Sequence, residues 1–133
     1  MAAAGQTSAA TTGGRVLEIQ VERTEDHTVC RPIGELDAHV VNEFREVLAG
    51  LVREPRFVID LCEVPFMDSA ALGALIRGIR RIKEQRGAVA VACNRPAVCQ
   101  LLHTTGMDRI VGVFDSHQGA VESFSDNSGV EQQ

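Results

Sequence analysis

The stretch FVIDLCEVPFMDSAALGALIRGIRR, residues 57–81, decides how the rest of the chain is interpreted. Its first five residues form a nearly continuous apolar run, which is typical of a central strand covered on both faces. Asp68 and Ser69 then stand where apolar residues begin to recur at helical spacing. A buried strand followed by an amphipathic helix favours an α/β domain, and it places an Asp-Ser pair at the junction between the two elements.

The helix that begins after Asp68 has two different sides when successive residues are separated by about 100°. The side predicted to pack on the sheet carries Leu72, Leu75, Ile76, Ile79 and Ile82. The opposite side carries Ala70, Ala74, Arg77 and Arg81, with Gly73 at one margin. Because small exposed residues let another surface come close to the backbone, we expect the first two turns to form a docking surface.

Ser69 has three interpretations. In the plainest one, the Asp-Ser pair only caps the helix, with the Asp68 carboxylate accepting from the free backbone N–H groups. In the second, Ser69 is a nucleophile, but the Gly-x-Ser-x-Gly motif is absent and no catalytic triad can be assembled, so we do not expect an enzyme. In the third, Ser69 carries a regulatory hydroxyl.

Short β-prone segments and helical patterns alternate along the chain. The predicted strands cover residues 16–21, 28–33, 57–61, 88–93 and 110–114. The predicted helices cover residues 38–53, with Asp37 as N-cap, then the helix after Asp68, then 96–105 and 118–124. The predicted fold class is α/β, a single domain with a mixed central sheet of about five short strands and about four helices. Residues 1–14 are expected to be a disordered lead, 15–125 the folded domain and 126–133 a disordered tail.

The composition limits the kind of partner. A net charge of −5 argues against a nucleic-acid binder, because a phosphate backbone demands clustered positive charge. The five basic residues within 77–86 are interpreted as a solvated helix face, since the chain has no Trp or Tyr on which bases could stack. Neither an export signal nor a membrane-spanning apolar run is visible, so we expect a cytoplasmic protein that binds no membrane.

Four cysteines stand at positions 30, 62, 93 and 99, and none forms a Cys-x-x-Cys pair. Cys99 and His103 are four residues apart on a predicted helix, with Cys93 shortly before them, which is compatible with a zinc or redox site. Their neighbours are apolar, however, and packed, reduced thiols are the preferred interpretation. We therefore expect no metal and no cofactor, and redox control remains an alternative.

Five segments together carry a resemblance to a known family. They are residues 34–37 (GELD), 57–61 (FVIDL), 66–69 (FMDS), 72–73 (LG) and 105–107 (TGM). From about residue 15 to residue 124, the chain resembles the bacterial STAS-domain anti-sigma factor antagonists. The resemblance implies a regulator that binds an anti-sigma factor of the ATP-binding serine kinase type and releases its sigma factor. Phosphorylation at the start of the second long helix would then break the complex.

The resemblance and the predicted docking surface together indicate which residues meet the partner. The implied partner-binding residues are Glu35, Asp37, Asp68, Ser69, Ala70, Gly73, Ala74 and Arg77. The family pattern is Asp-Ser-Ser/Thr-Gly-Leu-Gly, with the second hydroxyl residue as the usual phosphoacceptor, and this chain has Ala70 at that position. Either Ser69 is the acceptor, which we favour, or the switch has been lost and the protein binds constitutively.

The family leaves one further function open, because STAS domains also serve as scaffold subunits of larger stress-signalling complexes. A redox-controlled antagonist is a second variant. For the isolated chain we expect a monomer or a weak dimer.

Overall fold

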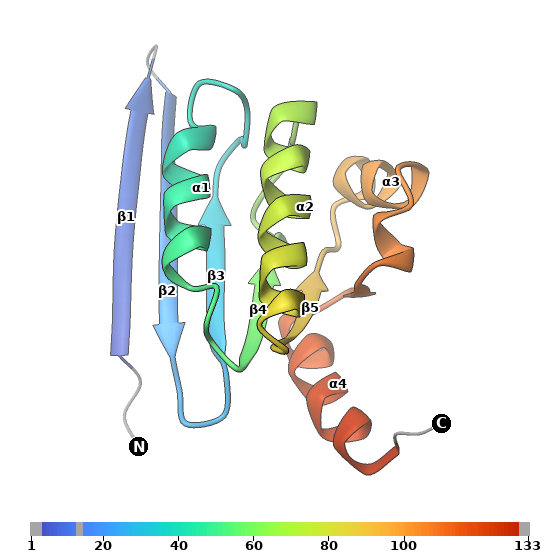
Figure 1. The fold of residues 1–133 in the computed structure, drawn as a ribbon. Helices are drawn as coiled ribbons and strands as arrows, with labels where there is room; N and C mark the ends of the chain where they lie inside the picture. The colour runs from blue at the N-terminus through green and yellow to red at the C-terminus, as the bar shows by residue number, and fades with distance from the viewer. Residues whose placement is uncertain (1–3, 13–14, 131–133) are drawn as a thin grey trace.

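The centre of the fold is a six-stranded mixed sheet (Figure 1). The computed structural model describes residues 4–12 and 15–130. The strands lie side by side in chain order and are β1 (Ala4–Thr12), β2 (Arg15–Arg23), β3 (Thr28–Ile33), β4 (Arg56–Asp60), β5 (Ala88–Ala92) and β6 (Gly112–Phe114). The pairs β1–β2 and β2–β3 are antiparallel, and the remaining three pairs are parallel. The predicted α/β fold with a mixed sheet is confirmed.

Helices connect the parallel strands. They are α1 (Val41–Gly50), α2 (Ser69–Glu84), α3 (Pro96–Thr104) and, after β6, α4 (His117–Val130). A short 3₁₀ turn, Met107–Arg109, follows α3. Each parallel pair is thus linked by a β-helix-β crossover, and the chain adds strands to the sheet in one direction. Among the described residues, no helix is both long and apolar enough to cross a membrane.

Alternation along the strands gives the sheet two apolar faces. Phe57 and Ile59 of β4 belong to the main core with residues of α1, α2 and α3, whereas Val58 between them belongs to a second cluster with Ala120 and Phe124 of α4. Successive strand residues point to opposite faces, so this split follows from the continuous apolar run in β4. Figure 1 shows α1 and α2 side by side across the same face of the sheet.

The chain ends depart from the prediction of disorder. Residues 4–12 of the expected disordered lead form β1, which pairs with β2 along its whole length. At the other end, α4 continues to Val130 and so includes residues of the expected tail. Residues 1–3, 13–14 and 131–133 lie outside the described residues. The five predicted strands are all present, and β1 is the sixth.

The first helix begins later than predicted. Asp37 was expected to cap a helix over residues 38–53, but α1 starts at Val41 and ends at Gly50. Asp37 instead closes a turn, in which its Oδ1 accepts from the His39 backbone N–H at 2.9 Å and its carbonyl accepts from the Val40 N–H at 3.1 Å. An Asp side chain that satisfies a nearby N–H in a turn competes with helix formation, which explains the delayed start.

Candidate functional site

Two loops meet beyond the carboxyl ends of β3 and β4. Backbone hydrogen bonds join them: the Leu36 N–H donates to the Phe66 carbonyl at 2.9 Å, and the Asp68 N–H donates to the Leu36 carbonyl at 3.0 Å. The Gly34 N–H also donates to the Glu63 carbonyl at 3.1 Å, and Gly34 has a φ of 122°, which favours glycine. The loops of residues 34–40 and 61–68 therefore form one paired unit in front of α2.

Asp68 holds this unit together. Its Oδ1 accepts from the Ala71 N–H at 3.0 Å and caps α2, as the sequence predicted. Its Oδ2 accepts from the Ala38 N–H of the other loop at 2.9 Å. One carboxylate thus fixes both the start of α2 and the position of the neighbouring loop.

Ser69 is the first residue of α2, and its side chain is exposed. The helical projection placed Ala70 on the side that faces solvent, and this prediction was wrong. Ala70 is half-buried and packs against the main core. The reason is that α2 packs on α1 as well as on the sheet, so its buried arc is wider than its large apolar residues indicate.

Ala74 was also expected to be exposed, and it is only 2% exposed. It lines a small hollow of about 90 Å³ between α1 and α2, and the other lining residues include Leu48, Gly78 and the arginines at 45, 77 and 81. Small residues on this side of α2 let α1 come close, so their role is helix packing. The premise that made Ala74 a partner-binding residue is therefore overturned.

In the first two turns of α2, the exposed positions lie one residue earlier than predicted, whereas Arg77 and Arg81 are exposed as predicted. Ser69, Gly73 and Arg77 follow one another at four-residue spacing, and each is at least partly exposed. Glu35 is exposed on the neighbouring loop, whereas Asp37 is 5% exposed and Asp68 is half-buried. Of the implied partner-binding residues, Glu35, Ser69, Gly73 and Arg77 can meet another protein directly, while Asp37 and Asp68 hold the loops.

Phe66 was not among the implied partner-binding residues, although it is exposed beside them in the sequence. It is 47% exposed and is the one large apolar residue that is exposed in the described part of the chain. Its carbonyl is held by Leu36, so the ring stands on a fixed loop two residues before Asp68. The sequence contained one signal for this exposure, because Phe66 lies between the predicted strand and the predicted helix and belongs to the apolar pattern of neither. We define the Asp68 surface as Glu35, Ala38, Phe66, Ser69, Gly73 and Arg77.

Comparison with known proteins identifies the family. The family described as "STAS domain" matches residues 18–120. The chain belongs to the STAS domain family. A protein of Paenibacillus polymyxa named "Anti-sigma F factor antagonist" is 28% identical over 108 residues, which cover 79% of this chain and 92% of that protein.

Solved structures share the fold of this STAS domain. The crystal structure of an anti-sigma factor antagonist from Mycobacterium paratuberculosis superposes with a TM-score of 0.77 at 24% identity, covering 83% of this chain and 95% of that one. The Bacillus cell fate determinant SpoIIAA, solved in its phosphorylated form, has a TM-score of 0.63 at 20% identity, covering 80% and 98% of the two chains.

A charged pair supports the loop that leads to the Asp68 surface of the STAS domain. Asp60, at the end of β4, is 3% exposed, and its Oδ2 accepts from the Arg31 Nε at 3.0 Å while its Oδ1 accepts from the Cys62 N–H at 3.0 Å. Burial raises the pKa of Asp60, but the Cys62 hydrogen bond and Arg31 outweigh this and hold it below its usual value. The carboxylate therefore stays charged and fixes the start of residues 61–68.

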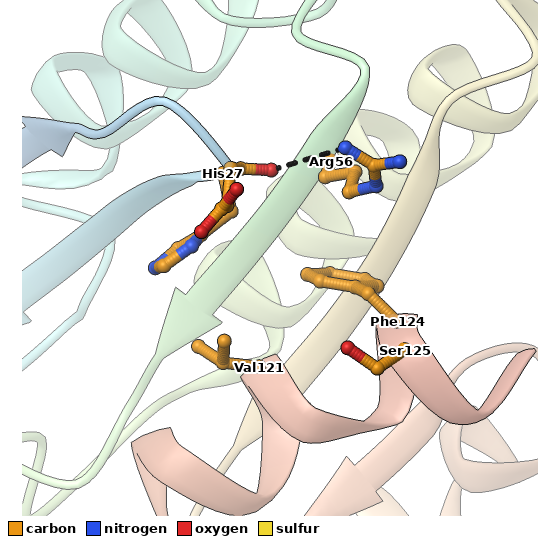
Figure 2. Close-up of a pocket in the computed structure, with 6 residues that line it drawn as sticks. His27, Arg56, Val121, Phe124 and Ser125 are labelled. Carbon is orange, nitrogen blue, oxygen red and sulfur yellow. Dashed lines mark hydrogen bonds between the residues drawn. The ribbon is translucent and has the colours of Figure 1, made fainter. Parts of the chain in front are cut away.

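A separate cavity lies at the far end of the STAS domain sheet (Figure 2). It has a volume of about 240 Å³ and is lined by His27 and Arg56, which lie at the amino ends of β3 and β4, and by Val121 and Phe124 of α4. The Arg56 side chain donates across its edge to the Asp26 carbonyl at 3.4 Å. The Asp68 surface lies beyond the opposite, carboxyl ends of these strands, so the cavity belongs to a different part of the STAS domain.

Of the three possible zinc ligands of the STAS domain, Cys93 and Cys99 contact each other, whereas His103 pairs with Asp108. His103 Nδ1 lies 2.8 Å from Asp108 Oδ2, and the Cys99 thiol donates to Cys93 Sγ at 3.1 Å. Within the described ranges, no group of three or more His, Cys, Asp or Glu residues is placed to hold a metal ion.

Proposed function

We propose that this STAS domain is an anti-sigma factor antagonist, a regulator and not an enzyme, which binds an anti-sigma factor through the Asp68 surface and releases a sigma factor. The observation that carries the proposal is the arrangement at the start of α2. There, Asp68 locks two loops together and leaves an exposed phenylalanine and an exposed serine on either side of it. Relatives named as antagonists that match over most of their length support it.

The arrangement is suited to binding another protein. Exposed aromatic residues on rigid backbone are common anchors of interfaces, because they bury a large area at a low entropic cost. Gly73 presents bare backbone next to Ser69, with no atom within 4 Å of the place where a Cβ would stand. Arg77 adds one positive charge at the end of the stripe. A partner with an apolar pocket and an acidic edge fits this pattern.

We further propose that the partner is an anti-sigma factor of the ATP-binding serine kinase type and that it phosphorylates Ser69. The γ-phosphoryl group of ATP is transferred to Ser69 Oγ, an O–P bond forms, and ADP and the hydroxyl proton are released. Ala70 at the usual acceptor position carries no hydroxyl and is half-buried, whereas Ser69 is exposed. The proposed acceptor is therefore Ser69.

A phosphate on Ser69 acts on the partner and spares the fold. It adds about −1.5 to −2 charges at neutral pH. Because the phosphate would stand in the first turn of α2, the positive end of the helix dipole stabilises its negative charge, typically by about 0.3–1 kcal/mol. The same charge, one residue after Asp68 and three residues after Phe66, repels an acidic partner and blocks close approach. Phosphorylation is therefore expected to release the partner without unfolding the domain.

Binding to a purified kinase-type anti-sigma factor tests the proposal. We expect Ser69→Glu to weaken binding by about tenfold, or about 1.4 kcal/mol, and Ser69→Ala to bind like the parent and to accept no phosphoryl group by intact mass. Gln118→Glu is the matched control, because it adds one charge to the first turn of α4, away from the Asp68 surface. It should bind like the parent.

Phe66→Ala tests the surface without relying on phosphorylation. We expect it to weaken binding by about tenfold or more, since truncating an aromatic anchor typically costs more than 1 kcal/mol. Its thermal stability should stay close to that of the parent, because the ring is 47% exposed. Unchanged binding of both Phe66→Ala and Ser69→Glu would refute the Asp68 surface as the partner site.

A further inference from the structure

Two cysteines face each other where β5 leads into α3. Cys93 directly follows β5 and is 2% exposed, and Cys99 lies in α3 and is partly exposed. Their sulfur atoms are 3.1 Å apart, with the Cys99 thiol donating to Cys93 Sγ. A disulfide has an S–S distance of about 2.05 Å, so a movement of about 1 Å brings the two sulfurs to bonding distance.

We propose that Cys93 and Cys99 form a reversible disulfide when the protein meets a low-molecular-weight disulfide. In the first step the Cys99 thiolate attacks one sulfur of the oxidant, which forms a mixed disulfide and releases one thiol. In the second step the Cys93 thiolate attacks the Cys99 sulfur and releases the second thiol. The two cysteines lose two electrons and two protons in total, and the oxidant is reduced to two thiols.

The environments of the two thiols set this order of attack. Burial raises the pKa of Cys93 to about 12. A thiol with so high a pKa is a poor first nucleophile, because the thiolate is the reactive form. Cys99 is the partly exposed member of the pair and is the one that a dissolved oxidant can reach. Cys93 then acts as the resolving thiol.

Contacts of Arg95 connect the pair with the Asp68 surface. The Arg95 carbonyl accepts from the Cys99 N–H at 2.8 Å, and the Arg95 Nε donates to the Cys62 carbonyl at 2.9 Å. At the next residue, Glu63, the backbone carbonyl accepts from the Gly34 N–H. The Glu63 carboxylate lies 3.8 Å from the Arg95 guanidinium. Drawing Cys99 towards Cys93 moves the first turn of α3, and we expect this to displace Arg95 from the loop of residues 61–68.

This coupling gives the disulfide a regulatory consequence, which rests on the proposed function because the loop of residues 61–68 carries Phe66 and Asp68. The disulfide itself is independent of that function. Its formation is measured on the protein alone, so a failure to find an anti-sigma partner leaves the test of the disulfide intact.

The test titrates the reduced full chain with oxidised glutathione, followed by alkylation of the remaining thiols and peptide mapping by mass spectrometry. We expect a Cys93–Cys99 link that dithiothreitol reverses, that Cys99→Ser abolishes and that Cys30→Ser retains, since Cys30 is fully buried elsewhere in the core. Alkylation of both thiols after oxidation, or a link from Cys93 to Cys62 instead, would overturn the proposal.

Amide hydrogen exchange of the oxidised and reduced forms tests the coupling. We expect faster exchange at the Gly34 amide, whose acceptor is the Glu63 carbonyl, in the oxidised form. Cys99→Ser treated with the same oxidant should show no such change. Equal exchange at Gly34 in a sample that carries the disulfide would overturn the coupling to the Asp68 surface.

Discussion

Asp68 combines two tasks that are usually divided between residues. It caps α2 through Oδ1 and holds the Ala38 N–H of the other loop through Oδ2. Ser69, its neighbour, is left with its side chain exposed. The cap and the proposed switch are thus separate residues, so a modification of Ser69 would leave the helix cap in place.

We expect Asp68→Ala to lower the free energy of unfolding by about 1–2 kcal/mol, because it removes a helix cap and the acceptor of a second backbone N–H. Urea unfolding measures this loss. Asp68→Asn should lose less, since its amide oxygen can accept from one of the two N–H groups. Asp115→Ala is the control, as it removes an exposed carboxylate from another turn. Equal stability of Asp68→Ala and the control would contradict the role given to Asp68.

At the scale of the helices, the close approach of α1 and α2 depends on small residues in α2. Ala74 is buried beside α1, and a Cβ added at Gly78 would stand 3.0 Å from Leu48 Cδ1. The two helices are therefore in close contact at Gly78, and the hollow beside Ala74 is far smaller than an arginine side chain needs. By contrast, Gly73 faces away from α1 and has open space around it.

Ala74→Arg is consequently expected to destabilise the protein by about 3 kcal/mol or more, since it forces a long charged side chain into a packed helix interface. Thermal or urea unfolding measures the change. Gly73→Ala is the matched control one residue earlier. It should raise the free energy of unfolding by up to about 1 kcal/mol, because alanine loses less backbone entropy than glycine in a helix. A stable Ala74→Arg protein would show that α1 and α2 can separate at little cost.

The comparison of these two positions shows what could be predicted from the sequence. Large apolar residues at helical spacing correctly identified the sheet-facing side of α2, as the burial of Leu75 and Ile79 shows. Alanine and glycine carry no comparable signal, because the same residues suit an exposed stripe and a close helix contact. Their assignment at Ala70 and Ala74 required the position of α1, which only the folded chain provides.

In the strands and in the site, too, local sequence patterns could be interpreted, whereas contacts between distant segments could not. Apolar runs predicted β3 and β4 closely, whereas β1 consists of Ala, Gly, Gln, Ser and Thr and has no apolar alternation. The Asp68–Ser69 junction was predicted because capping is a local property of the sequence. The pairing of the two loops and the exposure of Phe66 depend on contacts between segments about thirty residues apart, and no local pattern records them.

In the whole molecule, α4 closes the second face of the sheet, and a pair of histidines marks its junction with the strands. His27 precedes β3, His117 begins α4, and their ring centroids are 5.9 Å apart. His117 Nε2 is buried, and no residue in the described part of the chain offers it a hydrogen bond. Burial and, next, the charge of a protonated His117 lower the pKa of His27 from 6.5, and Asp26 and Glu22 offset this only in part.

The histidine pair is therefore expected to reduce the stability of the protein in mild acid. Well above pH 6.5, His27 is neutral in both the folded and the unfolded state and does not change the stability. As the pH falls through about 6.5, the unfolded chain binds a proton that the folded chain resists, because burial and His117 disfavour the charged form of His27. The free energy of unfolding should thus fall between pH 7.5 and pH 5, and fall less in His27→Gln. Urea unfolding of parent and variant at both pH values measures the difference, and parallel losses in the two proteins would refute it.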